Sequence, residues 1–153
     1  MSGSVAIIGG GISGLSCARR LNELGWKDVV VFDTGKRAVG GRSSSRTINN
    51  GSVIVDHVCQ CFTAHSDRFK AIVDAWLQAG AVRAWGLGKC GTLKGGEFRP
   101  DQVPRYVGVH GMATLPAYLA QGLDVRRNIM TPVFLLFIPM LACCVQGLSL
   151  IHI

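Results

Sequence analysis

The sequence predicts an α/β fold that begins with a strand–helix–strand unit, and three segments carry this prediction. Val5–Ile8 is an apolar run that stops at a glycine, as a buried parallel strand does. Ser13–Leu24 repeats leucine and alanine on one side at three-residue steps, which is typical of an amphipathic helix, and Gly25 ends it. Val29–Phe32 is a second β-branched run. A strand, a helix and a second strand in this order form a βαβ unit of a parallel sheet.

The overall composition favours a packed globular protein. The chain has 153 residues, of which 48% are hydrophobic and 16% are charged, so a core can form. The formal net charge is +7, but the basic residues are scattered apart from a partial cluster at Lys36, Arg37, Arg42 and Arg46. We assign that cluster to one bound anion, so nucleic acid is not an expected partner. No signal peptide pattern opens the chain, which favours a cytoplasmic location.

A glycine-rich loop joins the first predicted strand to the helix. Residues 9–14 read Gly-Gly-Gly-Ile-Ser-Gly, which has the spacing G-x-G-x-x-G, and an acid, Asp33, follows the second strand. This context predicts a Rossmann-like dinucleotide-binding unit. Gly9 permits the sharp turn, Gly11 lets the backbone approach a pyrophosphate, and Gly14 allows helix and strand to pack closely. The helix N-terminus then faces the phosphates, and Asp33 accepts hydrogen bonds from ribose hydroxyls.

A second glycine motif follows the second strand. Gly40 and Gly41 are adjacent, Arg42 follows them directly, and Arg37 lies three positions before them. Two neighbouring glycines let a second stretch of backbone approach the cofactor, and an arginine beside them can pair with a phosphate through two parallel hydrogen bonds. The alternative interpretation of this segment is a solvated basic loop.

Several runs of residues together resemble one family. The runs VAIIGGGISGLSCARRL, VVVFD and VGGRSSSRT resemble the start of the flavin-containing amine oxidoreductases, and RYVGVHGMATLPAYLA is similar to a segment of their renalase-like branch. The resemblance covers about residues 4–127. It implies an FAD-dependent oxidoreductase with a small-molecule electron donor, in which the flavin performs the hydride chemistry. The implied cofactor-binding residues are Gly9, Gly11, Ile12, Ser13, Gly14, Asp33, Arg37, Gly41 and Arg42.

Some details of that resemblance stay open. The segment from Asp33 to Gly40 is one residue longer than in many members, so either Lys36 or Arg37 can take the place nearest the ribose. The resemblance also puts Gln60 on the substrate side and His57 beside the flavin. Catalytic residues are not assigned.

The resemblance also predicts how the chain is divided. Residues 1–56 are expected to bind FAD, residues 57–128 to begin a substrate domain, and residues 129–153 to form a non-native hydrophobic tail. The uncharged segment 129–145 has two alternatives, a membrane anchor and a buried helix, but a membrane is not an expected partner. Because family members are longer, we expect an incomplete fragment that neither retains FAD nor turns over an amine, and that aggregates, when expressed alone.

The remaining sequence predicts further short elements. A strand is expected near Val53–Val55, a helix over Asp67–Leu77, short strands and turns over residues 84–104, and a helix over Gly111–Leu123. Residues 43–50 are polar and predict no element. The aromatic residues expected in the core are Phe69, Trp76, Trp85 and Phe98.

Other kinds of chemistry find little support. The six cysteines form no C-x-x-C pair and the histidines lack metal-ligand spacing, so no metal site is expected. Cys59 and Cys61 are expected on one face of a strand, as free buried thiols. Two alternatives to the flavoprotein stay open: an NAD-dependent dehydrogenase that uses the same glycine loop, and a small non-catalytic nucleotide-binding protein.

Overall fold

The computed structural model describes residues 3–86 and 88–130. The tail predicted from residue 129 therefore lies, apart from its first two residues, outside the described residues. Within the described ranges, no helix has both the length and the apolar character needed to cross a membrane.

The predicted βαβ unit is confirmed. Strand β1 spans Ser4–Ile8, helix α1 spans Ile12–Glu23 and strand β2 spans Asp28–Phe32. The two strands are parallel and in register from the first residue of each to the last. Gly25 follows the helix with φ of +88°, a left-handed conformation that glycine adopts without steric cost.

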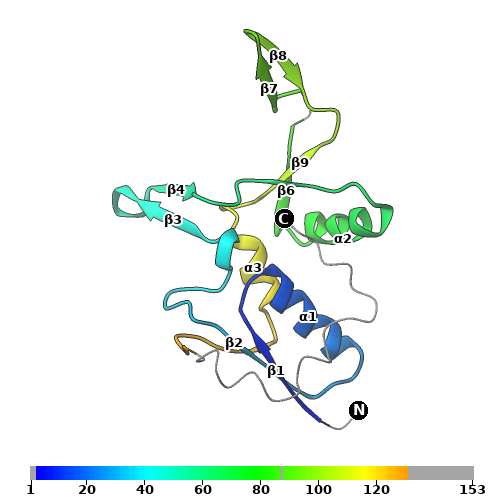
Figure 1. Cartoon of the computed structure of the whole chain (residues 1–153), viewed down its shortest axis with the longest axis vertical. Helices are drawn as coiled ribbons and strands as arrows, with labels where there is room; N and C mark the ends of the chain where they lie inside the picture. The colour runs from blue at the N-terminus through cyan, green and yellow to red at the C-terminus, as the bar shows by residue number, and fades with distance from the viewer. Residues whose placement is uncertain (1–2, 87, 131–153) are drawn as a thin grey trace.

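A third parallel strand comes from a distant part of the chain. Strand β10, Asp124–Arg126, pairs with β2, so the sheet order is β1-β2-β10 (Figure 1). Helix α1 covers one face of this sheet, where Ala18, Val29 and Val31 are buried. Leu123 and Val125 pack against the same cluster. The chain therefore leaves the sheet after β2, makes a long excursion and returns to the side of β2.

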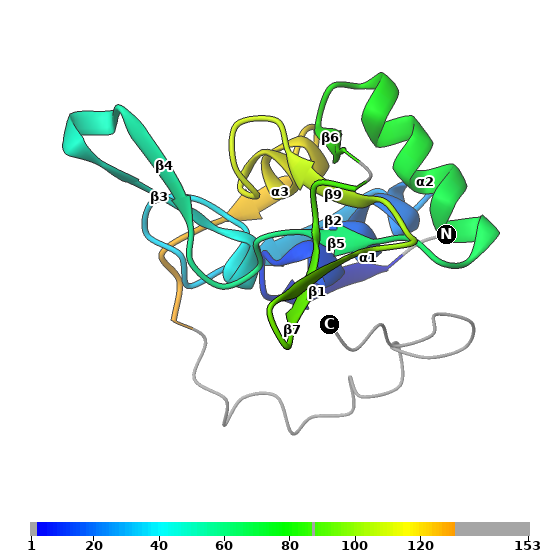
Figure 2. The ribbon, with the colours of Figure 1, turned by 90° about the horizontal axis from the view of Figure 1, so that it is seen from above.

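The excursion holds the other elements of the described chain (Figures 1 and 2). One antiparallel sheet has the order β5-β9-β6, and two hairpins are formed by β3 with β4 and by β7 with β8. Short 3-10 turns lie at Gly41–Ser43 and Asn49–Gly51. The strands and helices of the excursion are β3 Ser45–Ile48, β4 Val53–Asp56, β5 Phe62–Thr63, α2 Asp67–Gln78, β6 Val82–Trp85, β7 Gly91–Lys94, β8 Glu97–Pro100, β9 Arg105–Gly108 and α3 Thr114–Leu119.

One hydrophobic cluster joins the excursion to the βαβ unit. Leu15 of α1 and Val39 lie in the same buried cluster as Val73, Trp76 and residues of α3. Arg19 adds a polar link, because its Nη1 donates to the carbonyls of Tyr118 and Leu119 at 3.3 and 3.4 Å, at the end of α3. A cation at a helix C-terminus is favourable because it faces the negative end of the dipole. Helix α3 is thus held directly against α1.

Strand β3 lies in the polar segment 43–50, where the sequence predicted no element. It forms because β4 supplies the backbone partners, so pairing replaces the missing apolar pattern. The turn between them places Asn49 and Asn50 at φ of +49° and +55°. Asparagine tolerates this left-handed region better than most residues.

Two other expectations were wrong in part. The helix expected over Gly111–Leu123 is only Thr114–Leu119, and Gly111 at φ of +83° belongs to the turn before it. Phe69 and Trp76 pack in the core as expected, but the side chains of Trp85 and Phe98 are 41% and 51% exposed. The reason is their position: β6 runs outward and the β7–β8 hairpin extends from the body of the molecule (Figure 1).

Candidate functional site

The glycine loop between β1 and α1 has the backbone that its sequence predicts. Gly9 has φ of +107°, and its N–H donates to the carbonyl of Phe32 at 2.8 Å. A Cβ on Gly14 would lie 2.0 Å from the carbonyl oxygen of Gly9, so only glycine fits there. The inferred role of Gly14 in helix–strand packing is therefore confirmed.

Gly11 differs from Gly14, because the space beside it is open. Its φ of −82° and ψ of 178° are ordinary extended values. A Cβ at this position would meet only the carbonyl oxygen of Gly40, at 4.0 Å. Nothing in the described chain itself requires glycine here. The absence of a side chain leaves room for a ligand to approach the backbone.

The middle glycine of the loop, Gly10, is a sterically constrained position that the sequence analysis missed. A Cβ on Gly10 would lie 2.9 Å from Cγ of Asp33 and 3.2 Å from Cγ1 of Val39. Its N–H donates to Oδ1 of Asp33 at 3.0 Å. The available signal was the run of three consecutive glycines, but the G-x-G-x-x-G spacing leaves the middle one free. Contact with a residue 23 positions away imposes the requirement.

Asp33 lies at the carboxyl end of β2 and connects two segments. Oδ1 accepts from Gly10 N, and Oδ2 accepts from Gly35 N at 3.2 Å. The side chain is half-buried beside the glycine loop. Each carboxylate oxygen can accept more than one hydrogen bond, so Asp33 keeps acceptor capacity for hydroxyl groups of a ligand.

The second glycine motif lies directly against the first. Gly40 N–H donates to the carbonyl of Gly10 at 2.8 Å, and Gly40 forms a parallel bridge with Gly11. Gly40 and Gly41 have φ of +133° and +53°, which favour glycine. Two motifs that are 30 positions apart thus form one continuous backbone surface.

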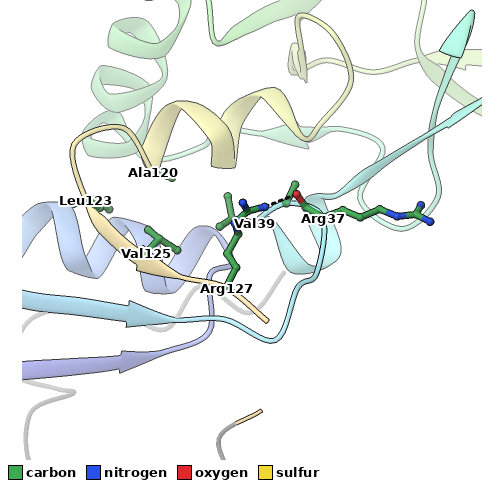
Figure 3. Close-up of a pocket in the computed structure, with 7 residues that line it drawn as sticks. Arg37, Val39, Ala120, Leu123, Val125 and Arg127 are labelled. Carbon is green, nitrogen blue, oxygen red and sulfur yellow. Dashed lines mark hydrogen bonds between the residues drawn. The ribbon is translucent and has the colours of Figure 1, made fainter. Parts of the chain in front are cut away.

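The other predicted site residues adjoin the two motifs in the sequence. Ile12 and Ser13 open α1, with Ser13 exposed and Ile12 packed against the core cluster. Lys36, Arg37 and Arg42 are exposed. The side chain of Arg37 extends away from Arg127, which contacts its carbonyl (Figure 3). Which of Lys36 and Arg37 contacts a ligand stays a prediction.

A cavity of about 280 Å³ lies between residues 37–39, just before the second motif, and residues 120–127. It is largely apolar, with a guanidinium at its edge (Figure 3). The residues that line it include Arg37, Val39, Ala120, Leu123, Val125 and Arg127. None of the residues of the glycine loop lines it.

Cys59 lies beside the second motif, and its amide donates to the carbonyl of Arg42 at 3.1 Å. Cys59 and Cys61 do not lie on a strand as expected, because the chain bends between β4 and β5; both are half-buried. Burial raises the pKa of the Cys59 thiol, and a hydrogen bond with Ser43 opposes that rise. His57 and Gln60, which are close to Cys59 in the sequence, are exposed. In the described ranges, no group of three His, Cys, Asp or Glu could hold a metal ion.

Comparison with known protein families agrees with this geometry. Residues 7–76 match a family model described as an NAD(P)-binding Rossmann-like domain. The matched span includes both glycine motifs and Asp33. The predicted α/β, Rossmann-like fold is therefore confirmed, and the chain contains a nucleotide-binding domain of a type that is typical of oxidoreductases.

Proposed function

We propose that this chain supplies the FAD-binding part of an FAD-dependent oxidoreductase of the renalase-like amine-oxidase type. The contact between the two glycine motifs carries the proposal, because Gly40 N lies 2.8 Å from the carbonyl of Gly10. A dehydrogenase of the NAD type usually continues from the second strand into its next helix. Here the chain instead returns a second glycine pair to the pyrophosphate side of the loop. The resemblance to flavin-containing amine oxidoreductases supports the same cofactor.

The start of α1 is suited to the pyrophosphate. Gly11 is its N-cap, no side chain caps the first turn of α1, and that turn contains no acid. The N–H groups at a helix N-terminus lack partners within the helix, and they face outward with the positive end of the dipole. We infer that Ile12, Ser13 and Gly14 direct these groups at phosphate oxygens. The open space beside Gly11 admits that approach.

The other residues have separate tasks in this proposal. Asp33 binds the hydroxyl groups of the adenosine ribose, while Arg42 and Gly41 approach the pyrophosphate from the second motif. Lys36 or Arg37 adds positive charge near the ribose. Bound FAD would supply the hydride chemistry, and the residues of the chain bind and orient it.

A small-molecule electron donor would approach from the excursion, where the resemblance places Gln60 and His57. We propose that residues 1–56 form the cofactor-binding part and that residues 57–128 begin the substrate-binding part. The return of β10 to the sheet means that the second part also supports the first.

An NAD-dependent dehydrogenase is the second candidate. One observation favours it: the matching family model is described as NAD(P)-binding. The glycine loop and an acid after β2 serve NAD as well as FAD, since both cofactors contain an adenosine and a pyrophosphate.

A titration of the full-length protein with each cofactor separates the two candidates. We expect FAD to bind more tightly than NAD, with quenching of flavin fluorescence as the signal. A protein that binds NAD but not FAD would support the dehydrogenase instead. A protein that binds neither would remove both proposals.

Replacement of Asp33 should weaken the cofactor more mildly than a change in the glycine loop. For Asp33→Ala in the full-length protein we expect a loss of about 1–3 kcal/mol in binding free energy, the range for a hydrogen bond to a charged group. Part of this loss arises because Gly10 and Gly35 lose their shared acceptor. Isothermal titration with FAD measures it.

Asp28→Ala is the matched control for that experiment. Asp28 is exposed at the opposite end of β2, where it contacts the hydroxyl of Ser4. Its replacement should leave the FAD dissociation constant unchanged. An Asp33→Ala protein that binds as tightly as Asp28→Ala would show that Asp33 is not in the site.

A further inference from the structure

We infer that Arg127 is a positioning residue for the proposed cofactor site, because it holds the loop at residues 36–38 in place. This inference rests on the proposed function in one respect, namely that the loop contributes to dinucleotide binding. The contact between Arg127 and the loop does not depend on any cofactor. Arg127 has no role in the predictions from sequence, and it lies 90 positions from the residue that it contacts.

Both ends of the loop are fixed by backbone hydrogen bonds. At the start, Asp33 N donates to the carbonyl of Arg126 at 2.9 Å, and Asn128 N donates to the carbonyl of Gly35 at 3.2 Å. At the other end, Gly40 N donates to the carbonyl of Gly10. The segment from Asp33 to Gly40 is therefore hydrogen-bonded at its start to β10 and to Asn128, and at its end to the glycine loop.

The middle of the loop is exposed and is contacted by one long side chain. Lys36, Arg37 and Ala38 are all exposed. The Nη1 of Arg127 donates to the carbonyl of Arg37 (Figure 3). A charged donor makes a stronger hydrogen bond than a neutral one. The same contact leaves the Arg37 side chain pointing away from Arg127 and outward (Figure 3).

The conformation of this loop determines where two candidate cofactor residues point. Lys36 and Arg37 both lie in it, between Asp33 and Gly40. A loop that samples several conformations reduces apparent affinity, because only the competent fraction binds. Removal of the Arg127 side chain should increase that sampling while the fixed ends of the loop stay in place.

Arg126 offers a matched control on the neighbouring residue. Its guanidinium pairs with Asp124 at 3.1 Å and lies over the ring of Phe32, with a distance of 5.8 Å to the ring centroid. Arg126→Ala removes the same charge and a similar volume as Arg127→Ala. It leaves the side-chain contact with the loop intact.

Limited trypsin digestion of the full-length protein without cofactor tests directly whether Arg127 holds the loop in place. Lys36 and Arg37 are themselves trypsin sites, and cleavage there requires the loop to open. We expect Arg127→Ala to increase the rate of cleavage after these residues by about tenfold. The rate is measured by mass spectrometry, from the appearance of the N-terminal fragments that end at Lys36 or Arg37. Arg127→Lys should restore slow cleavage, since an ammonium group also donates to a carbonyl. The Arg126→Ala variant should be cleaved at the loop at the same rate as the wild type.

Cleavage after Arg20 in α1 monitors global unfolding in the same digests. If Arg127→Ala accelerates cleavage at the loop and at Arg20 equally, the variant is globally destabilised. Arg127→Gln then replaces it, because glutamine keeps part of the aliphatic stem without the charge. Equal loop cleavage in wild type and in the folded variant would overturn the inference. An equal rise in Arg126→Ala would overturn it as well.

A titration with FAD supplies the second measurement. Arg127→Ala should raise the dissociation constant about fivefold, with Arg127→Lys close to the wild type and Arg126→Ala unchanged. Faster loop cleavage with unchanged FAD affinity would overturn the positioning role. If the wild type binds neither FAD nor NAD, the proposed function fails, yet the digestion result still decides whether Arg127 holds the loop.

Discussion

Gly14→Ala is expected to destabilise the chain by about 2–4 kcal/mol, although alanine is the better helix former. The added Cβ would lie 2.0 Å from the carbonyl oxygen of Gly9 and 3.3 Å from Cγ2 of Ile7. The first of these atoms belongs to the backbone, so no side-chain rotation can relieve the clash. Helix α1 would have to move away from β1, and the packing of Leu15 and Ala18 would be lost with it. Urea denaturation followed by circular dichroism measures the change.

The same substitution three residues earlier is the control. A Cβ on Gly11 meets one atom at 4.0 Å, and the backbone there has ordinary extended angles. Gly11→Ala should therefore change the free energy of unfolding by less than about 1 kcal/mol. If both variants were equally stable, the close approach of α1 to Gly9 would be refuted.

In the full-length protein, Gly11→Val is expected to abolish FAD binding and leave the fold intact. The branched side chain would fill the open space beside Gly11, where we place the pyrophosphate. We expect the dissociation constant to rise at least about 100-fold, which corresponds to about 2.7 kcal/mol. Flavin fluorescence titration gives the affinity, and a thermal melt without cofactor reports on the fold.

Two comparisons make that result specific. Gly11→Ala should give an intermediate loss of affinity, because its side chain is smaller. Ser16→Val adds a valine at an exposed position of the same helix and should leave FAD binding unchanged. Normal FAD affinity in a folded Gly11→Val protein would show that the glycine loop does not contact the cofactor.

Most of the βαβ unit could be predicted from the sequence because its signals are local. Apolar runs, three-residue spacing and glycine at a turn each depend on neighbouring residues, and β1, α1 and β2 lie within two residues of their predicted bounds. Helix α2 was predicted for the same reason. Elements that depend on a partner were missed or shortened, as with β3, which needs β4, and α3, which is cut short by the turn at Gly111.

The sequence by itself determined the Rossmann-like fold class and the glycine, acid and arginine residues proposed to bind the cofactor. Only the tertiary structure decided three contacts. The amide of Gly40 donates to the carbonyl of Gly10, β10 pairs with β2, and Arg127 contacts the loop at Arg37. The physical reason is separation along the chain: each of these contacts joins segments brought together by packing of the intervening core, and no local pattern of residues encodes it. The preference for glycine at Gly10 has the same origin, since the side-chain atoms that would crowd a Cβ belong to Asp33 and Val39.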